Sequence, residues 1–226
     1  MTCPLRGLIA GIDEAGRAPL AGPVVSSCVV WVDLPQSREK VNDSKLLTEH
    51  ERNRLFSWIM DNAYRVGVGM ASHEEIERMN IHHATLLSME RAVENTAANP
   101  DILLVDGVFP LKRYHASKAI VKGDRKCFFM ACASIIAKVT RDRLMAEYGK
   151  TFPEYLFEKN KGYPTPEHRK AIGQYGICPI HRKTFKGVAE YVGGERRAVS
   201  GEQQELPLTA SRQDPAQYPI RKREKR

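Results

Sequence analysis

The chain has 226 residues, of which 42% are hydrophobic and 27% charged, as in ordinary globular proteins. No apolar run reaches the roughly 20 residues that a membrane span needs, and the first residues lack a signal-peptide pattern, so we expect neither a membrane protein nor a secreted one. The formal net charge of +8 favours a polyanionic partner, above all nucleic acid, and five cysteines without a CxxC pair indicate reduced thiols in a cytoplasmic protein.

Apolar periodicity predicts that strands and helices alternate in the first half of the chain. The expected elements, in chain order, are strands over 8–13 and 24–32, a helix over 46–60, a strand over 64–70 and a helix over 82–97. The capping-box sequence Ser72-His-Glu-Glu75 predicts the start of the helical region that leads into the last of these.

The second half of the chain continues the alternation and then changes composition. The expected elements are strands over 102–106 and 119–122 and helices over 128–148 and 166–174. Short apolar strands of this kind suit a sheet covered on both faces. We therefore expect an α/β fold with a mixed sheet over residues 1–148, a small helical region over 149–194, and a tail over 195–226 that is too polar to bury a core and should be disordered.

Acidic residues fall at the ends of three predicted strands, as Asp13-Glu14, Asp106 and Asp124. Strand ends that lie side by side form the crevice where ligands bind in open α/β sheets. Carboxylates gathered there would repel one another unless cations lay between them, and hard ions such as Mg²⁺ or Mn²⁺ prefer oxygen ligands. Two such ions could hold the attacking and leaving oxygens of a phosphodiester displacement.

Each of these acidic residues also has a structural interpretation. Asp106-Gly107 and Gly123-Asp124 are common turn dipeptides. Adjacent residues on a strand point to opposite faces, so Asp13 and Glu14 share one site only if the strand ends or bends at Glu14. Spacing alone leaves the shared metal site as one of two hypotheses.

Several segments resemble, in the same order, the motifs of bacterial ribonuclease HII (type 2 ribonuclease H). They are GIDEAGRAPLAGPV over 11–24, Asn42–Lys45, Asn80–Thr85, Val105–Gly107, Lys122–Asp124, Ala133–Asp142, Lys161–Thr165 and His181–Phe185. The resemblance runs from about residue 7 to 192, which is nearly everything except the tail.

The resemblance implies an RNase H-like five-stranded mixed sheet and a metal-dependent endoribonuclease, with Asp13, Glu14, Asp106 and Asp124 as catalytic ligands of Mn²⁺ or Mg²⁺. The implied reaction hydrolyses the RNA strand of RNA–DNA hybrids, leaves a 5′-phosphate and a 3′-hydroxyl, and also cuts at single ribonucleotides in duplex DNA. The alternatives are a nuclease or integrase of the same fold that acts on DNA, and a nucleic-acid binding module without catalysis. We expect a monomer.

Other residues acquire substrate roles through the same resemblance. Tyr163 would stack on the sugar beside the cleaved ribonucleotide, and Gly16, Arg17 and Ala18 would approach it closely, although the family has glycine where this chain has Ala18. The candidate phosphate contacts are Ser44, Lys45, Ser134, Lys138, His181 and Arg182. An ordinary exposed polar helix face would explain Ser134 and Lys138 equally well, and the pair His82-His83 lacks metal-ligand partners and is interpreted as structural.

The tail carries one further motif. Residues 203–208, Gln-Gln-Glu-Leu-Pro-Leu, resemble the short peptide by which bacterial replication and repair proteins hold the DNA sliding clamp. Leu206 and Leu208 could enter an apolar groove, Gln203 could hydrogen-bond at its edge, and Pro207 favours an extended backbone. Alternatively, the basic end of the tail over 221–226 only adds nonspecific affinity for DNA.

Overall fold

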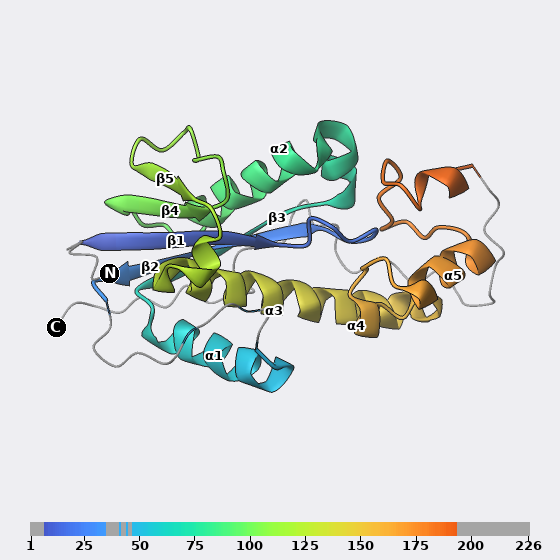
Figure 1. Cartoon of the computed structure of the whole chain (residues 1–226), viewed down its shortest axis with the longest axis horizontal. Coiled ribbons are helices and arrows are strands. Elements are labelled where there is room, and N and C mark those ends of the chain that lie inside the picture. The colour runs from blue at the N-terminus through green and yellow to red at the C-terminus, as the bar shows by residue number, and fades with distance from the viewer. Residues whose placement is uncertain (1–6, 35–40, 42–43, 45–46, 194–226) are drawn as a thin grey trace.

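The computed structural model describes residues 7–34, 41, 44 and 47–193. Five strands form one sheet in the order β3-β2-β1-β4-β5 (Figure 1). The strands are β1 (Leu8–Ala15), β2 (Val24–Val32), β3 (Arg65–Ala71), β4 (Ile102–Asp106) and β5 (Ser117–Ile120). The pairs β1–β2 and β2–β3 are antiparallel, whereas β4 is parallel to both β1 and β5. The predicted mixed five-stranded sheet is confirmed.

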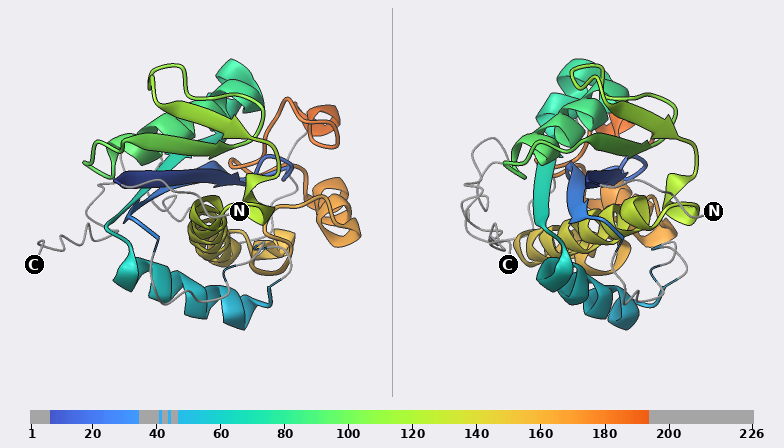
Figure 2. Two further views of the ribbon diagram at one scale, coloured as in Figure 1. Left: turned by 60° about the vertical axis from the view of Figure 1, so that its left-hand side comes forward. Right: turned by 90° about the vertical axis from the view of Figure 1, so that its left-hand side faces the viewer.

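Helices cover both faces of this sheet. They are α1 (Glu49–Asn62), α2 (His73–Glu94) and α3 (Phe128–Thr151), and two shorter helices, α4 (Phe157–Asn160) and α5 (Pro166–Tyr175), follow in the C-terminal region. In Figures 1 and 2, α2 lies on one face and α3 on the other, with α1 beyond α3. Successive side chains of β1 point to opposite faces of the sheet, so the strand contributes to a hydrophobic core on each face. Ile9 packs in the core with α1 and α3, and Ala10 packs in the core with α2.

The contact between β1 and α3 is unusually close because Gly11 has no side chain. A Cβ atom at Gly11 would lie 2.1 Å from the carbonyl group of Phe129 in the first turn of α3. Backbone therefore packs against backbone at this point. The residues that follow Gly11 on β1 are held directly against the N-terminal part of α3.

A second core lies under the C-terminal region. It joins Leu20 and Ala21 with the end of α3 at Met145 and Tyr148, and with Phe157 of α4 and Ile172 of α5. The expected boundary after residue 148 thus falls inside α3, whose last residues pack with the segment that follows. No helix of the described residues is long and apolar enough to cross a membrane.

Several element boundaries differ from the expected ones. Strand β1 runs to Ala15 because its pairing with β2 continues through Glu14 and Ala15. Helix α1 begins at Glu49 rather than at residue 46 because Thr48 caps it. Asp124 does not lie at a strand end, since β5 ends at Ile120 and Asp124 belongs to a short 3₁₀ helix, Gly123–Arg125. Helix α4 was not expected.

Candidate active site

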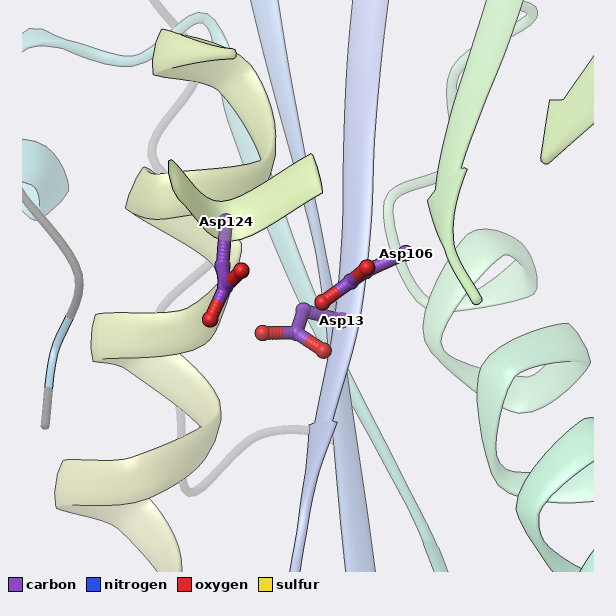
Figure 3. A group of neighbouring side chains, drawn as sticks. All are labelled: Asp13, Asp106 and Asp124. Atoms are coloured by element: carbon purple, nitrogen blue, oxygen red, sulfur yellow. The ribbon is translucent and has the colours of Figure 1, made fainter. Parts of the chain in front are cut away.

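Three carboxylates meet at one end of the sheet. Asp13 comes from β1, Asp106 from the end of β4, and Asp124 from the 3₁₀ turn before α3, and each offers an oxygen within 4.8 Å of the others (Figure 3). The parallel register pairs Ile12 with Val105, so the next residues along the two strands, Asp13 and Asp106, are neighbours. The predicted convergence of these three residues is confirmed for the side chains themselves.

The turn between β5 and α3 is shaped to complete this group. The backbone N–H of Gly123 donates a 2.8 Å hydrogen bond to Oδ1 of Asp106. Lys122, just before it, adopts a left-handed conformation with φ of +55°, and a Cβ at Gly123 would lie 2.3 Å from the sulfur of Met130. This tight turn ties Asp106 to the segment that carries Asp124.

Burial makes the charges of this group costly. The pKa of Asp13 is raised well above its ordinary value by burial first and then by the charges of Glu14 and Asp106. Hydrogen bonds from Ser134 and from the Glu14 backbone partly offset that rise. Buried carboxylates that repel one another need a counter-charge, and their oxygen donors fit a divalent cation such as Mg²⁺ or Mn²⁺. The residues present therefore fit a metal centre.

Glu14 lies beside this group but on the other face of β1. Its strand partner Ser26 bonds to Ser88 of α2, whereas Ser27, the partner of Asp13, bonds to the carbonyl of Ala133 in α3. Glu14 is not among the three acidic residues with oxygens within 4.8 Å of one another. It forms an ion pair with Arg17 at 3.5 Å and lines a pocket that Asp106 also borders. Burial raises the pKa of Glu14, although Arg17 opposes that rise.

The loop after β1 shows where glycine is required. Gly16 has a φ of +100°, and a Cβ there would lie 2.1 Å from Nε of Arg141. Ala18 has no positive φ, and its side chain is exposed. Alanine at position 18 therefore fits its backbone without strain, whereas Gly16 does not tolerate a side chain.

Two buried arginines hold the loop over residues 16–23 through hydrogen bonds to its backbone carbonyls. Arg182 donates to the carbonyl oxygens of Gly16, Arg17 and Gly22 at 2.6, 2.9 and 2.9 Å. Arg141 donates to those of Ala21, Pro23 and Lys161. Burial lowers the pKa of Arg182 to about 9 and that of Arg141 to about 10.

These contacts correct two predictions. His181 and Arg182 were expected to contact phosphates, but both side chains are completely buried and cannot reach a ligand on the surface. Arg141 was not singled out, although it lies within the motif over 133–142. A positively charged residue facing the apolar side of α3 was the available signal for a structural arginine.

The ring of Tyr163 lies close to two basic side chains, Lys138 and Arg141. Its ring is half-buried, with Nζ of Lys138 at 5.6 Å and Cζ of Arg141 at 5.9 Å from the ring centre. Lys138 is also paired with Asp142 at 2.8 Å. The adjacent Gly162 packs against the Ala21 carbonyl, where a Cβ would come within 2.7 Å. Tyr163 is thereby fixed next to the loop that begins at Gly16.

Of the remaining predicted substrate and partner contacts, some lie near the carboxylates and others lie outside the described residues. Ser44 and Ser134 share a 2.8 Å hydrogen bond between their hydroxyls, and Ser134 also bonds to Asp13, so both serines support the carboxylates. Lys45 and the tail residues Gln203, Leu206 and Leu208 lie outside the described residues.

The sequence was also compared with those of known protein families and proteins. The sequence profile of the family described as ribonuclease HII matches residues 10–188. A ribonuclease HII of Geobacter sulfurreducens is 51% identical over 191 residues, which cover 83% of this chain and 86% of that protein.

Solved structures give the same result. The ribonuclease H2 of Pyrococcus horikoshii OT3 superposes with a TM-score of 0.69 at 30% identity, over 81% of this chain and 96% of that one. A ribonuclease HII from Archaeoglobus fulgidus, solved as a complex with PCNA, superposes with a TM-score of 0.69 at 29% identity, over 79% and 95%.

Proposed function

The chain belongs to the ribonuclease HII family and is a ribonuclease H, an endonuclease of RNA–DNA hybrids, and we propose that Asp13, Glu14, Asp106 and Asp124 are its catalytic metal ligands. The observation that carries this assignment is the convergence of buried Asp13 and Asp124 with half-buried Asp106, whose oxygens lie within 4.8 Å of one another. The pKa of Asp13 is raised by burial and by the charges of Glu14 and Asp106, and no cationic side chain of the described residues is among the causes that lower it, as is typical of a functional carboxylate.

These carboxylates would hold a divalent ion, Mg²⁺ or Mn²⁺, which would supply positive charge to the reacting phosphodiester and would lower the pKa of the attacking water. The protein's part is to hold the oxygens in place. Gly123 orients Asp106 through its N–H, and Ser134 and the Glu14 N–H orient Asp13. Glu14 lines the neighbouring pocket that Asp106 also borders, which supports its inclusion among the proposed ligands.

Recognition of the ribonucleotide is assigned to the two adjoining loops. The exposed segment Arg17-Ala18, with Gly16, presents backbone groups and a positive charge, and Tyr163 offers a ring face to the sugar. Lys138 and Lys45, which follows Ser44, are proposed to approach phosphates, whereas Ser44 and Ser134 act on the carboxylates. Under this proposal residues 1–148 carry the chemistry and residues 149–194 hold the substrate against it.

The proposed partners are RNA–DNA hybrid, ribonucleotide-containing duplex DNA and the DNA sliding clamp. The ribonuclease HII from Archaeoglobus fulgidus is in a complex with PCNA in its solved structure, which supports the proposal that this chain also binds a partner of this kind. The tail sequence assigns Gln203, Leu206 and Leu208 to that contact. We also propose a monomer in the cytoplasm. The buried thiols of Cys28 and Cys132, which form no disulfide, are consistent with a reducing compartment.

The substrate assignment is tested by cleavage of matched duplexes that carry no ribonucleotide, one ribonucleotide or a full RNA strand, each with Mg²⁺ and with Mn²⁺. We expect cleavage of the last two and none of the first. Cleavage of the all-DNA duplex would favour a DNA nuclease of the same fold. Intact substrates in every reaction, with binding retained, would favour a non-catalytic module.

A further inference from the structure

Two histidines of the C-terminal region contact each other in the interior. His168 of α5 and His181 are both completely buried, and their Nε2 atoms lie 3.0 Å apart. The rings of Tyr155 and Phe157 pack around both imidazoles. The role that we assigned to His181 from the sequence does not fit this position, so another explanation is required.

The groups at the two ends of the pair determine where each proton lies. The backbone N–H of Cys178, which can only donate, lies 2.9 Å from Nδ1 of His181, closer than the Cys178 carbonyl at 3.3 Å, so we assign this nitrogen as the acceptor. The Cys178 thiol, 3.0 Å away, can donate to the same nitrogen. The carbonyl of Tyr163 can only accept, and it lies 2.9 Å from Nδ1 of His168, so that nitrogen carries a proton.

The contact between the rings then follows. Because Nδ1 of His181 accepts, the proton of that ring is on Nε2, which donates to the bare Nε2 of His168. In this arrangement both rings are neutral, and each ring has one protonated and one unprotonated nitrogen. A second proton on His181 would lie on Nδ1 and oppose the Cys178 N–H, and a second proton on His168 would lie on Nε2 and oppose the Nε2–H of His181. Burial also lowers the pKa of His168, which favours the neutral form.

This directional chain connects the two loops that face the substrate. At one end, His168 holds the carbonyl of Tyr163. At the other, His181 forms a backbone bridge with Ala21, and the next residue, Arg182, donates to the carbonyls of Gly16 and Arg17. The imidazole pair is therefore a side-chain link, in addition to Arg141, between the Tyr163 segment and the segment of His181 and Arg182 that supports the Gly16 loop.

We propose that His168 and His181 are positioning residues, which act as a neutral imidazole relay that sets the Tyr163 segment against the Gly16 loop. The proposal rests on the proposed function for the role of Tyr163, but the protonation pattern itself does not. The relay touches neither substrate nor the carboxylates. It determines how well a ribose is held next to them.

Two substitutions at one position separate the two bonds of His168. In His168→Asn the amide N–H₂ takes the place of Nδ1–H, which keeps the bond to the Tyr163 carbonyl and loses the acceptor for His181. In His168→Gln the amide oxygen takes the place of Nε2, which keeps the acceptor for His181 and loses the bond to Tyr163. Both variants remove similar packing, so their stabilities should be similar.

The proposal predicts different kinetics for the two variants on a duplex with one ribonucleotide. His168→Gln should lower kcat about tenfold or more with little change in KM, since small displacements of a positioning group cost this much, whereas His168→Asn should retain most of kcat. Equal losses in both variants, in proportion to their melting temperatures, would mean a merely structural pair and overturn the proposal.

A second measurement on the wild-type protein does not depend on activity. Long-range ¹H–¹⁵N spectra of histidine-labelled protein at pH 7.5 should show one buried imidazole protonated at Nδ1 alone and one protonated at Nε2 alone, assigned as His168 and His181 with the variants. A cationic ring, or the opposite tautomers, would overturn the relay even if every cleavage experiment succeeded. If wild-type protein failed to cleave while these tautomers were present, the proposed function and not the relay would be at fault.

Discussion

Arg182 donates a 2.6 Å hydrogen bond to the carbonyl of Gly16, 166 residues earlier in the chain. Both groups are buried, and the same guanidinium also reaches Arg17 and Gly22. Arg182, near the end of the fold, thus determines the shape of the loop that follows Asp13 and Glu14. The prediction that Arg182 contacts a phosphate is replaced by this role.

Arg182→Lys should therefore destabilise the protein although it keeps the charge. A lysine cannot bond three divergent carbonyls at once, and leaving two of them unsatisfied should lower the free energy of unfolding by about 3 kcal/mol. Urea unfolding measures this. Arg78→Lys is the matched control, because the Arg78 side chain is 72% exposed and its replacement should cost less than about 0.5 kcal/mol. Similar stability of both variants would contradict the assigned role.

The loop itself is predicted to tolerate change at one position and not at the other. Gly16→Ala should lower both stability and turnover, because the new Cβ would meet Arg141 at 2.1 Å and the φ of +100° suits glycine alone. We expect a loss of about 2 kcal/mol or more in unfolding free energy. Ala18→Gly, two residues away, should change stability by less than about 1 kcal/mol. A stable and active Gly16→Ala variant would refute the close packing of this loop.

Tyr163→Ala should affect cleavage more than binding. Phosphate contacts supply most of the affinity for a duplex, whereas the tyrosine ring is expected to position the sugar. We predict at least a tenfold loss of kcat on the single-ribonucleotide duplex and less than a threefold change in the dissociation constant, as measured by fluorescence anisotropy. Tyr191→Ala, which removes an exposed tyrosine elsewhere, should change neither. Parallel losses of binding and turnover would argue against sugar positioning by Tyr163.

The buried histidines predict how stability depends on pH. Burial lowers the pKa of His168 below 6.5, so the unfolded chain takes up a proton at this residue before the folded protein does. Stability should therefore be retained above pH 7 and fall below about 6.5, by at most about 1.4 kcal/mol per pH unit for one proton. His168→Asn should lose this part of the slope in urea unfolding at a series of pH values. If the unfolding free energies of the wild-type protein and of His168→Asn depended on pH in the same way, this prediction would be contradicted.

The sheet and two of the carboxylates could be predicted from the sequence because they depend on local pattern. Short apolar runs indicated β2 and β4 at their observed bounds, and neighbouring parallel strands necessarily bring Asp13 and Asp106 together. The side on which Glu14 lies could not be predicted, because it depends on β1 continuing two residues past Asp13.

The burial of charged residues could not be predicted from the sequence either. A basic residue in a nucleic-acid enzyme is ordinarily expected on the surface, and only the packing of the C-terminal region over residues 16–23 turns Arg141 and Arg182 inward. The bond between His168 and His181 likewise joins residues that no spacing rule pairs. These long-range contacts are consequences of tertiary packing.

The central claim is that the buried acidic group is the metal-dependent catalytic centre, and Asp106→Asn tests it most directly. An amide cannot replace a charged oxygen ligand, so the variant should fold and yet cleave a single-ribonucleotide duplex at least about a thousandfold more slowly in saturating Mn²⁺. Glu147→Gln, a change of an exposed carboxylate on α3, is the control and should cleave at the wild-type rate. Near wild-type turnover of Asp106→Asn under these conditions would contradict the account.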